Sequence, residues 1–247
     1  MIRKTKIIAT IGPSTSSKVM LKKLILKGVN VCRLNFSHLK HDVAKEIITN
    51  IKEINQELNT HTAILADLQG PKIRVGVFER PIQLKKGKKI IFSTKRKKDA
   101  IHISYANFAK DVSPKERVLL DDGKLNLEVV STNKKDTVVL EVIFGGLLQS
   151  RKGVNLPNTK ISLPCLTIKD KEDLSFVLAE KIEWIGLSFV RSANDVKILK
   201  KIIDKQNLNH KVIAKIEKPE AIKDIDAIIQ ATDAIMVARG DLGVEVP

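Results

Sequence analysis

Cysteine, aromatic residues and long apolar runs are all scarce in this chain of 247 residues. The two cysteines are too few for a disulfide framework, and the apolar run around Cys32 predicts a buried, reduced thiol. With one Trp, one Tyr and 4% aromatics, the core is expected to be aliphatic. No run approaches the roughly 18 to 20 apolar residues of a membrane span, and the stretch before Gly12 is too short for a signal-peptide core. These scarcities favour a soluble, cytoplasmic protein.

Acidic residues are also in the minority, since the chain has 28 Asp and Glu and 44 Lys and Arg, which gives a net charge of +16. This charge allows an anionic partner but does not identify one. The lysines are scattered, with clusters only at 85–89 and 95–98, and aromatic residues for base stacking are few. We therefore interpret the excess charge as solvated surface and expect neither a nucleic acid nor a membrane as partner.

Short apolar runs alternate with amphipathic segments in two parts of the chain. Helices are predicted from residue 18 to the stop at Gly28 and at 41–58, 169–181, 193–206 and 219–231. Strands are predicted at 5–12, 29–36, 62–70, 183–190, 211–217 and 233–241. None of these strands alternates apolar with polar residues, which predicts a parallel sheet that is covered on both faces.

This alternation stops near Arg74 and resumes near Ile168. Between them lie strand-like runs such as KIIFST, DTVVLEVIF and KISLP, with turn signals at Asp122-Gly123 and Asn133. The sequence therefore predicts a first barrel segment at 1–73, an all-β insert at 74–167 and a continued barrel at 168–247.

The predicted fold class is α/β, as an incomplete (β/α)8 barrel with an all-β insert after its third strand. A doubly wound sheet is the alternative, but no Gly-rich dinucleotide turn follows any strand. A full barrel needs eight strands, and only six are predicted before Pro247, so we expect truncation after the sixth.

Charged residues follow several of these apolar strands, at the ends where barrel enzymes carry their reactive groups. Lys215 and Glu217 are two apart on one strand and share a face. Glu217 and Asp241 end neighbouring strands, and two such carboxylates suit Mg2+. Any one of these groups alone is readily interpreted as a salt bridge, but together with Arg33 and Asp67 they indicate a phosphate-handling site.

Seven motifs in order resemble those of the pyruvate kinase family, from the first strand to the last residues. They are Thr5–Ser14, RLNFSH (33–38), GPKIR (70–74), GGLLQSRKGVNLP (145–157), GLSFVRS (186–192), AKIEKPEA (214–221) and MVARGDLGVE (236–245). The resemblance implies a (β/α)8 barrel with a lid domain, and transfer of a phosphoryl group from phosphoenolpyruvate to ADP. It further implies a cytoplasmic glycolytic enzyme that is a homotetramer at full length.

The resemblance also implies roles for single residues. Arg33 and Lys215 are the implied catalytic residues, and Gly240 and Asp241 join them in binding substrate. Glu217 and Asp241 are the implied ligands of Mg2+, with Mn2+ as a substitute, and Arg74 and Lys152 the implied nucleotide contacts.

One motif departs from the pattern that many family members share. Those members carry glutamate where this chain has Lys72, and they need K+ near side chains that match Asn35, Ser37 and Asp67 and the carbonyl of Leu68. Here the ammonium of Lys72 is expected to supply the charge that K+ brings elsewhere, as in the K+-independent branch. The sequence therefore predicts that K+ is not required.

The chain is about half as long as family members are, so we expect a truncated product, a split gene or a piece of a longer sequence that is inactive alone. Two other interpretations stay open at this point. One is a non-catalytic remnant, and the other is a different phosphoenolpyruvate-using barrel enzyme such as a carbon–carbon lyase.

Overall fold

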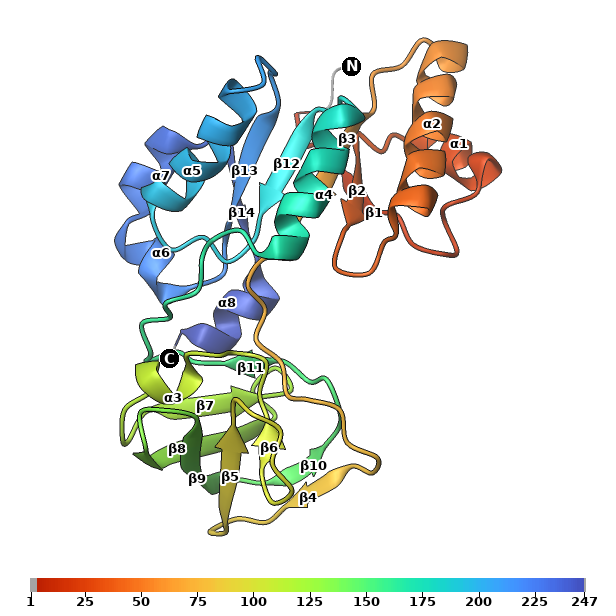
Figure 1. The fold of residues 1–247 in the computed structure, drawn as a ribbon. Helices are drawn as coiled ribbons and strands as arrows, with labels where there is room; N and C mark the ends of the chain where they lie inside the picture. The colour runs from red at the N-terminus through yellow and green to blue at the C-terminus, as the bar shows by residue number, and fades with distance from the viewer. Residues whose placement is uncertain (1–3, 247) are drawn as a thin grey trace. The chain divides into compact units, whose positions relative to one another are not determined.

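The computed structural model describes residues 4–246 and divides the chain into two compact units. The barrel unit comprises the chain up to Gly70 together with Cys165–Ile216 and Glu220–Val237. The lid unit comprises Pro71–Pro164, Glu217–Pro219 and the chain from Ala238 onward. The barrel unit has one sheet and the lid unit has two (Figure 1).

The barrel unit is built on one six-stranded sheet in which every neighbouring pair of strands is parallel. Its strands in spatial order are β1 (Ile8–Thr10), β2 (Val31–Asn35), β3 (Ala63–Asp67), β12 (Trp184–Leu187), β13 (Lys211–Ile216) and β14 (Ala234–Val237). Spatial order follows chain order without reversal, whereas a doubly wound sheet reverses its order once. The prediction of an incomplete (β/α)8 barrel is therefore confirmed, and the doubly wound alternative is wrong.

Helices connect these strands, and Figure 1 shows α1 beside α2 and α5 beside α7. Their bounds are α1 (Lys18–Leu26), α2 (His41–Leu58), α4 (Ile168–Ala179), α5 (Ala193–Asp204), α6 (Pro219–Lys223) and α7 (Ile225–Ala231). The Ser17 side chain caps α1 by accepting from the Met20 N–H, and Thr167 and Asp170 form a capping box on α4. Every helix predicted from residue 18 to residue 206 is found within two residues of its expected ends.

Two predicted elements near the end of the chain are wrong in detail. The single helix predicted at 219–231 is two helices that separate at Asp224, whose Oδ2 accepts from the Ala193 N–H at 2.8 Å. The strand predicted at 233–241 ends at Val237, and α8 (Arg239–Glu245) follows. The acidic Asp241 in the first turn of α8 favours a helix there because it complements the helix dipole.

The outer strands of the barrel sheet, β1 and β14, are edges. Their apolar side chains remain accessible, with Ile8 45% and Val237 55% exposed. Exposed edges of this kind are the expected consequence of a sheet that does not close. Across the described part of the chain, no helix combines the length and the apolar character needed to cross a membrane.

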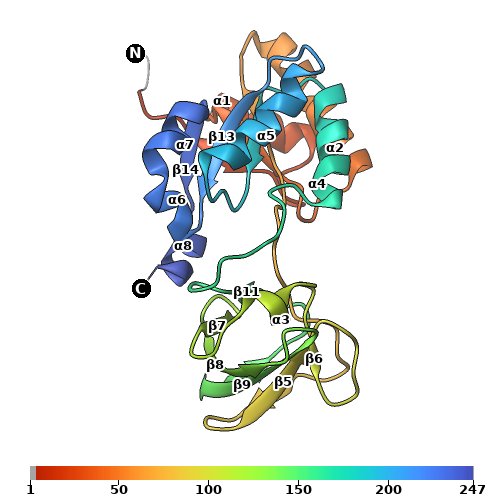
Figure 2. The ribbon, with the colours of Figure 1, turned by 60° about the vertical axis from the view of Figure 1, so that its left-hand side comes forward.

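The lid unit contains two sheets, the helix α8 already described and a further short helix, with the larger sheet curled on itself (Figure 2). The elements are β4 (Ile82–Leu84), β5 (Lys89–Ser93), β6 (Ile101–His102), α3 (Phe108–Asp111), β7 (Arg117–Leu120), β8 (Leu125–Thr132), β9 (Thr137–Phe144), β10 (Gly146–Leu148) and β11 (Val154–Asn155). The pairing order of the larger sheet is β11-β7-β8-β9-β5-β6, and β10 pairs with β4. The turns predicted at Asp122-Gly123 and Asn133 join β7 to β8 and β8 to β9, whereas KISLP (160–164) is not a strand.

Tyr105, the single tyrosine of the chain, lies in the apolar core of the lid unit. Burial, together with a hydrogen bond to Asp111, raises the pKa of its phenol to about 12. The neutral form is thus favoured in the folded lid, and this contribution to stability is complete below pH 10 and is lost as the pH rises through about 12. We expect phenolate absorbance to appear near pH 12, with no signal in Tyr105→Phe. Ionisation near pH 10 in a protein that is still folded would contradict this assignment.

Candidate functional site

Asp67, the last residue of β3, is the centre of a charged cluster in the barrel unit. It lies in register with Asn35 of β2 and Gly186 of β12, and its side chain is only 2% exposed. Gly186 makes room for it, because an added Cβ there would lie 3.2 Å from Asp67 Oδ1. A carboxylate that is buried to this degree needs cationic or hydrogen-bonding partners.

Arg33 and Lys215 are those partners. Arg33 Nε donates to Asp67 Oδ2 at 2.7 Å, Nη2 donates to the same oxygen, and Nη1 donates to Thr10 Oγ1 at 2.8 Å. Lys215 Nζ lies 3.1 Å from the other oxygen, Oδ1. One carboxylate thus holds two cations at the carboxyl ends of the strands, and a guanidinium and an ammonium are groups that bind anionic ligands.

Ser188 completes this cluster and was not among the residues predicted from the sequence. Its Oγ accepts from Lys215 Nζ at 2.8 Å and donates to the Leu68 carbonyl at 2.7 Å, with the whole residue buried. The only sequence signal was a hydroxyl directly after a buried strand in the motif GLSFVRS. Ser188 therefore fixes the ammonium of Lys215 and the chain after β3 at once.

Gly70 supports the same cluster from the end of the β3 loop. Its φ is +70°, and an added Cβ would lie 2.8 Å from the Cβ of Ser188. Its N–H donates to Asp170 Oδ1 at 3.0 Å, which ties the loop to the first turn of α4. A side chain at this position would have to displace Ser188, so glycine is required by both conformation and space.

The groups predicted to lie near a monovalent cation are found at the same strand ends. Asn35 Oδ1 accepts from the Ser37 N–H at 3.1 Å, and the Leu68 carbonyl is bonded to Ser188. Asp67 is shared between Arg33 and Lys215. Asn35 Oδ1, the Leu68 carbonyl and the Asp67 carboxylate therefore each already have a donor from the protein.

Arg74 and Lys152 lie on adjacent segments of the lid unit. Arg74 forms a β-bridge with Gly153, and its Nη1 donates to the Arg151 carbonyl at 3.0 Å. Lys152 Nζ lies 2.8 Å from Asp121 Oδ1, and its hydrogen bond is the main reason that the pKa of this carboxyl is lowered. The two cations predicted to contact the nucleotide thus belong to one neighbourhood within the lid unit.

Lys72 and Asp241 form a second pair in the lid unit, with 3.9 Å between Nζ and Oδ1. Both side chains are about one third exposed, so this is a loose surface pair. Gly240, directly before Asp241, is exposed, and an added Cβ would meet no atom within 4 Å. Packing within the protein therefore does not require glycine at this position.

Glu217 directly follows β13 and belongs to the lid unit with Asp241. It is 1% exposed, so its carboxylate lies among other groups of the protein. The two residues give an all-oxygen donor pair of the size that Mg2+ takes from proteins, the rest of its shell being water and substrate. No cluster of three or more His, Cys, Asp or Glu side chains suited to a metal occurs within residues 4–246. Carboxylates of this kind suit Mg2+ chemically, and the joint role of Glu217 and Asp241 as its ligands stays a prediction.

The predicted burial of Cys32 is confirmed. Cys32 and Cys165 are both free and buried, and burial raises the pKa of the Cys32 thiol to about 11. A thiol with such a pKa is a weak nucleophile at neutral pH. Burial of both thiols therefore favours a packing role for the two cysteines.

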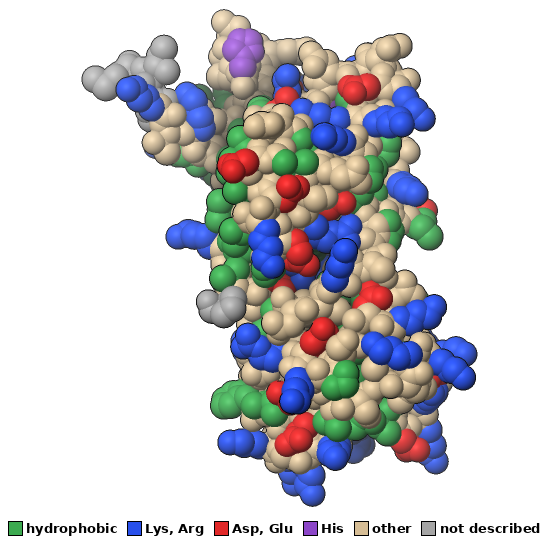
Figure 3. Space-filling model, turned by 90° about the vertical axis from the view of Figure 1, so that its left-hand side faces the viewer, with side chains coloured by type: hydrophobic (Ala, Val, Ile, Leu, Met, Phe, Trp, Pro, Cys, Tyr) green, Lys and Arg blue, Asp and Glu red, His purple; other side chains and the backbone are tan. Residues whose placement is uncertain are grey.

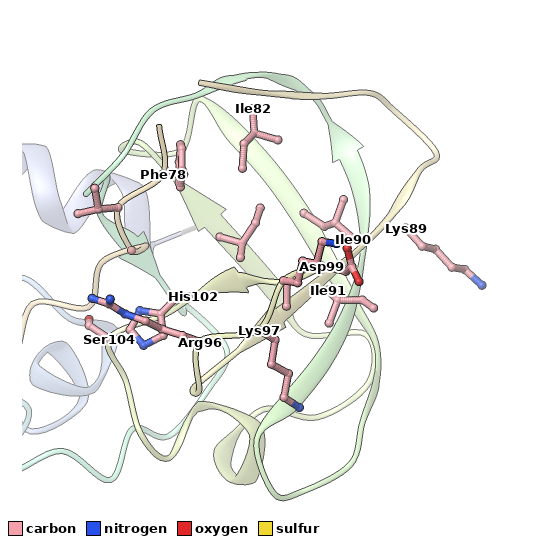
Figure 4. A pocket seen from close by; sticks show the side chains of 15 residues that line it. Phe78, Ile82, Lys89, Ile90, Ile91, Arg96, Lys97, Asp99, His102 and Ser104 are labelled. Atoms are coloured by element: carbon pink, nitrogen blue, oxygen red, sulfur yellow. The ribbon is translucent and has the colours of Figure 1, made fainter. Parts of the chain in front are cut away.

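A separate hollow of about 1070 Å³ opens in the lid unit (Figure 4). Its wall combines apolar Phe78, Ile82 and Ile90 with polar His102, and Figure 4 shows the side chain of Lys89 pointing away from it. None of the residues predicted for the functional site lines this hollow.

Basic side chains are spread over the face shown in Figure 3, interleaved with acidic and uncharged ones. Among the lysines of the lid unit, Lys97 pairs with Asp136 and Lys124 pairs with Asp121. This distribution favours the interpretation of the charge excess as solvated surface.

A parallel β/α barrel that carries charged side chains at the carboxyl ends of its strands defines the class of (β/α) barrel proteins whose ligand sites lie at those ends. Comparison with known families narrows this class. The profile described as "Pyruvate kinase, barrel domain" matches residues 2–247, and the chain therefore belongs to the pyruvate kinase family.

Individual relatives agree with this assignment. "Pyruvate kinase 2" of Synechocystis sp. is 47% identical over 99% of this chain and 43% of its own length. The pyruvate kinase of Geobacillus stearothermophilus is 42% identical over 100% of this chain and 43% of its own. A crystal structure of a pyruvate kinase from Cryptosporidium parvum superposes with a TM-score of 0.92 at 37% identity, covering 99% of this chain and 52% of that one. The chain thus spans about half the length of the relatives it matches.

Proposed function

We propose that this chain carries the phosphoenolpyruvate and metal-binding part of a cytoplasmic pyruvate kinase. In the proposed reaction the bond between phosphorus and the enol oxygen of phosphoenolpyruvate breaks, and a bond to the terminal phosphate oxygen of ADP forms. The products are ATP and, after protonation of the enolate, pyruvate. The observation that carries the proposal is the pairing of Arg33 and Lys215 on one buried carboxylate, Asp67, at the strand ends.

In this proposal Arg33 and Lys215 bind the phosphoryl group and the developing enolate. Arg33 presents a planar guanidinium, which matches phosphate oxygens. Lys215 presents a point charge that Asp67 and Ser188 hold in place before substrate arrives, so little reorganisation is needed during the reaction. Gly240 would let substrate approach the backbone closely, because the space beside its Cα is open.

Glu217 and Asp241 would hold the divalent cation, Mg2+ or in its place Mn2+. When bound, this cation supplies positive charge to the oxygens of the transferring group. Asp241 would thereby also contact the substrate.

Arg74 and Lys152 would bind the phosphates of the nucleotide. Both residues belong to the lid unit. As domain boundaries along the sequence, we propose a lid domain at 74–167 and barrel segments at 1–73 and 168–247. Exclusion of water by the lid would matter here, because water competes with ADP as phosphoryl acceptor. We propose a homotetramer only for full-length members of the family.

We propose that Lys72 replaces K+ in this site. Wild-type affinity for phosphoenolpyruvate with Mg2+ is then expected to be the same in K+ and in tetramethylammonium buffer. In Lys72→Glu the missing positive charge is expected to create a K+ dependence of about tenfold. Calorimetric titration measures this, with Lys86→Glu, an exposed lysine of the lid unit, as the control. Affinity for phosphoenolpyruvate that depends strongly on K+ in the wild type would contradict this proposal.

The function is tested by thermal unfolding with phosphoenolpyruvate and Mg2+. A ligand at about 100 times its dissociation constant stabilises by about 2.7 kcal/mol, so the wild-type Tm should rise by several degrees. The rise in Tm on ligand addition should vanish in Arg33→Leu and in Lys215→Met. It should persist in the control Lys200→Met, because Lys200 pairs with Asp233, which is more exposed than Asp67. A folded wild type with an unchanged Tm would contradict the proposal.

A further inference from the structure

A buried ion pair joins two separate segments of the lid unit. Lys218 Nζ lies 2.8 Å from Glu245 Oε1, and the two side chains are 6% and 1% exposed. Asn155 Nδ2 of β11 donates to the same Oε1 at 2.8 Å. Glu245 therefore holds together the chain after β13, strand β11 and helix α8.

The position of this pair in the sequence is significant for the proposed metal site. Lys218 directly follows Glu217, and Glu245 lies four residues after Asp241 on α8, about one helical turn away. The two proposed metal ligands are thus connected to the two partners of one ion pair, one by a single peptide bond and the other by about one turn of α8. A backbone shift that separates Lys218 from Glu245 would therefore also move Glu217 relative to Asp241.

The chemistry of the pair indicates a role in geometry. A buried ion pair contributes little net stability, because the desolvation of both charges offsets their attraction. Glu245 is also incompletely satisfied, since both donors bind Oε1 and Oε2 has no hydrogen-bond partner among the described residues. A buried and imperfectly satisfied pair is a poor source of stability, whereas it fixes two segments at one separation.

We propose that Lys218 and Glu245 are positioning residues that set the separation of Glu217 and Asp241 for a divalent cation. The proposal rests on the function proposed above, in which these two carboxylates bind Mg2+. Outer groups that orient metal ligands typically change metal affinity by about 10- to 100-fold when they are removed. Glu245→Gln removes the charge and keeps the shape of the side chain, so it isolates the ion pair.

Mn2+ binding tests the proposal, because the electron paramagnetic resonance signal of free Mn2+ falls as the ion binds. We expect Glu245→Gln and Lys218→Met each to weaken Mn2+ binding about tenfold or more. Glu57→Gln, which breaks the solvent-exposed pair with Lys22, is the control and should bind as the wild type does.

A second variant separates positioning from folding. Lys218→Met combined with Glu245→Leu replaces the pair by apolar side chains, which is expected to keep the protein folded. Weak Mn2+ binding in this folded double variant supports positioning, and wild-type affinity in it or in Glu245→Gln overturns the inference. If the wild type itself binds no more Mn2+ than Glu217→Gln does, the proposed metal site fails and the inference fails with it.

Discussion

Replacing Asp67 by alanine is expected to lower the free energy of unfolding of the barrel unit by about 3–5 kcal/mol. The change removes the one carboxylate that both Arg33 and Lys215 bind, and Lys215 is only 10% exposed. Two like charges would then lie near each other without the carboxylate that bridges them, which costs more than the loss of a surface pair. Urea unfolding followed by fluorescence measures this, because the single tryptophan, Trp184, lies in β12 next to β3.

Glu53→Ala is the matched control for Asp67. It also removes a carboxylate from a lysine, but both side chains of this pair are about half exposed. Its unfolding midpoint is expected to stay within error of the wild type. If Asp67→Ala unfolds at the same urea concentration as Glu53→Ala, Asp67 is not the electrostatic centre of the cluster.

Replacing either proposed metal ligand is expected to abolish tight binding of a divalent cation. Glu217→Gln and Asp241→Asn each remove one of the two proposed carboxylate donors to the metal. Each should weaken Mn2+ binding by about 100-fold or more, which exceeds the loss expected for variants of Lys218 and Glu245. Glu220→Gln, three residues after Glu217, is the control and should bind as the wild type does. The dissociation constants come from titration with Mn2+ followed by paramagnetic resonance.

Retained affinity in Glu217→Gln and Asp241→Asn would place the metal elsewhere. A loss in the Glu220→Gln control would instead indicate a general electrostatic effect of carboxylates near β13. The two outcomes are therefore distinguishable within one set of proteins.

Much of the fold follows from local sequence patterns. The apolar strands and the stripe of α2, whose Ile47, Ile48 and Ile51 are all buried, are periodic over many residues, and periodicity is a local property. The helix pair that breaks at Asp224 was missed, because the break depends on a bond to Ala193, distant in sequence. KISLP resembles a strand locally, yet the Ser162 N–H donates to the hydroxyl of Tyr105 and is not part of a β-ladder.

The candidate site was predictable where a charged residue stands toward the carboxyl end of an otherwise apolar strand. Arg33, Asp67 and Lys215 were found in this way, and the structure brings them together. Ser188 was missed because a hydroxyl after a strand is common and its role depends on contacts to Lys215 and Leu68. Lys218 and Glu245 were missed for a similar reason, since charged residues rarely indicate burial until the packing is known.

Calorimetric titration of phosphoenolpyruvate into the chain, with and without Mg2+, tests the central claim most directly. The account predicts saturable binding with Mg2+ that is lost without it and lost in Lys215→Met. Binding that is absent from the folded wild type, or that is equally strong without any divalent cation, would contradict the account.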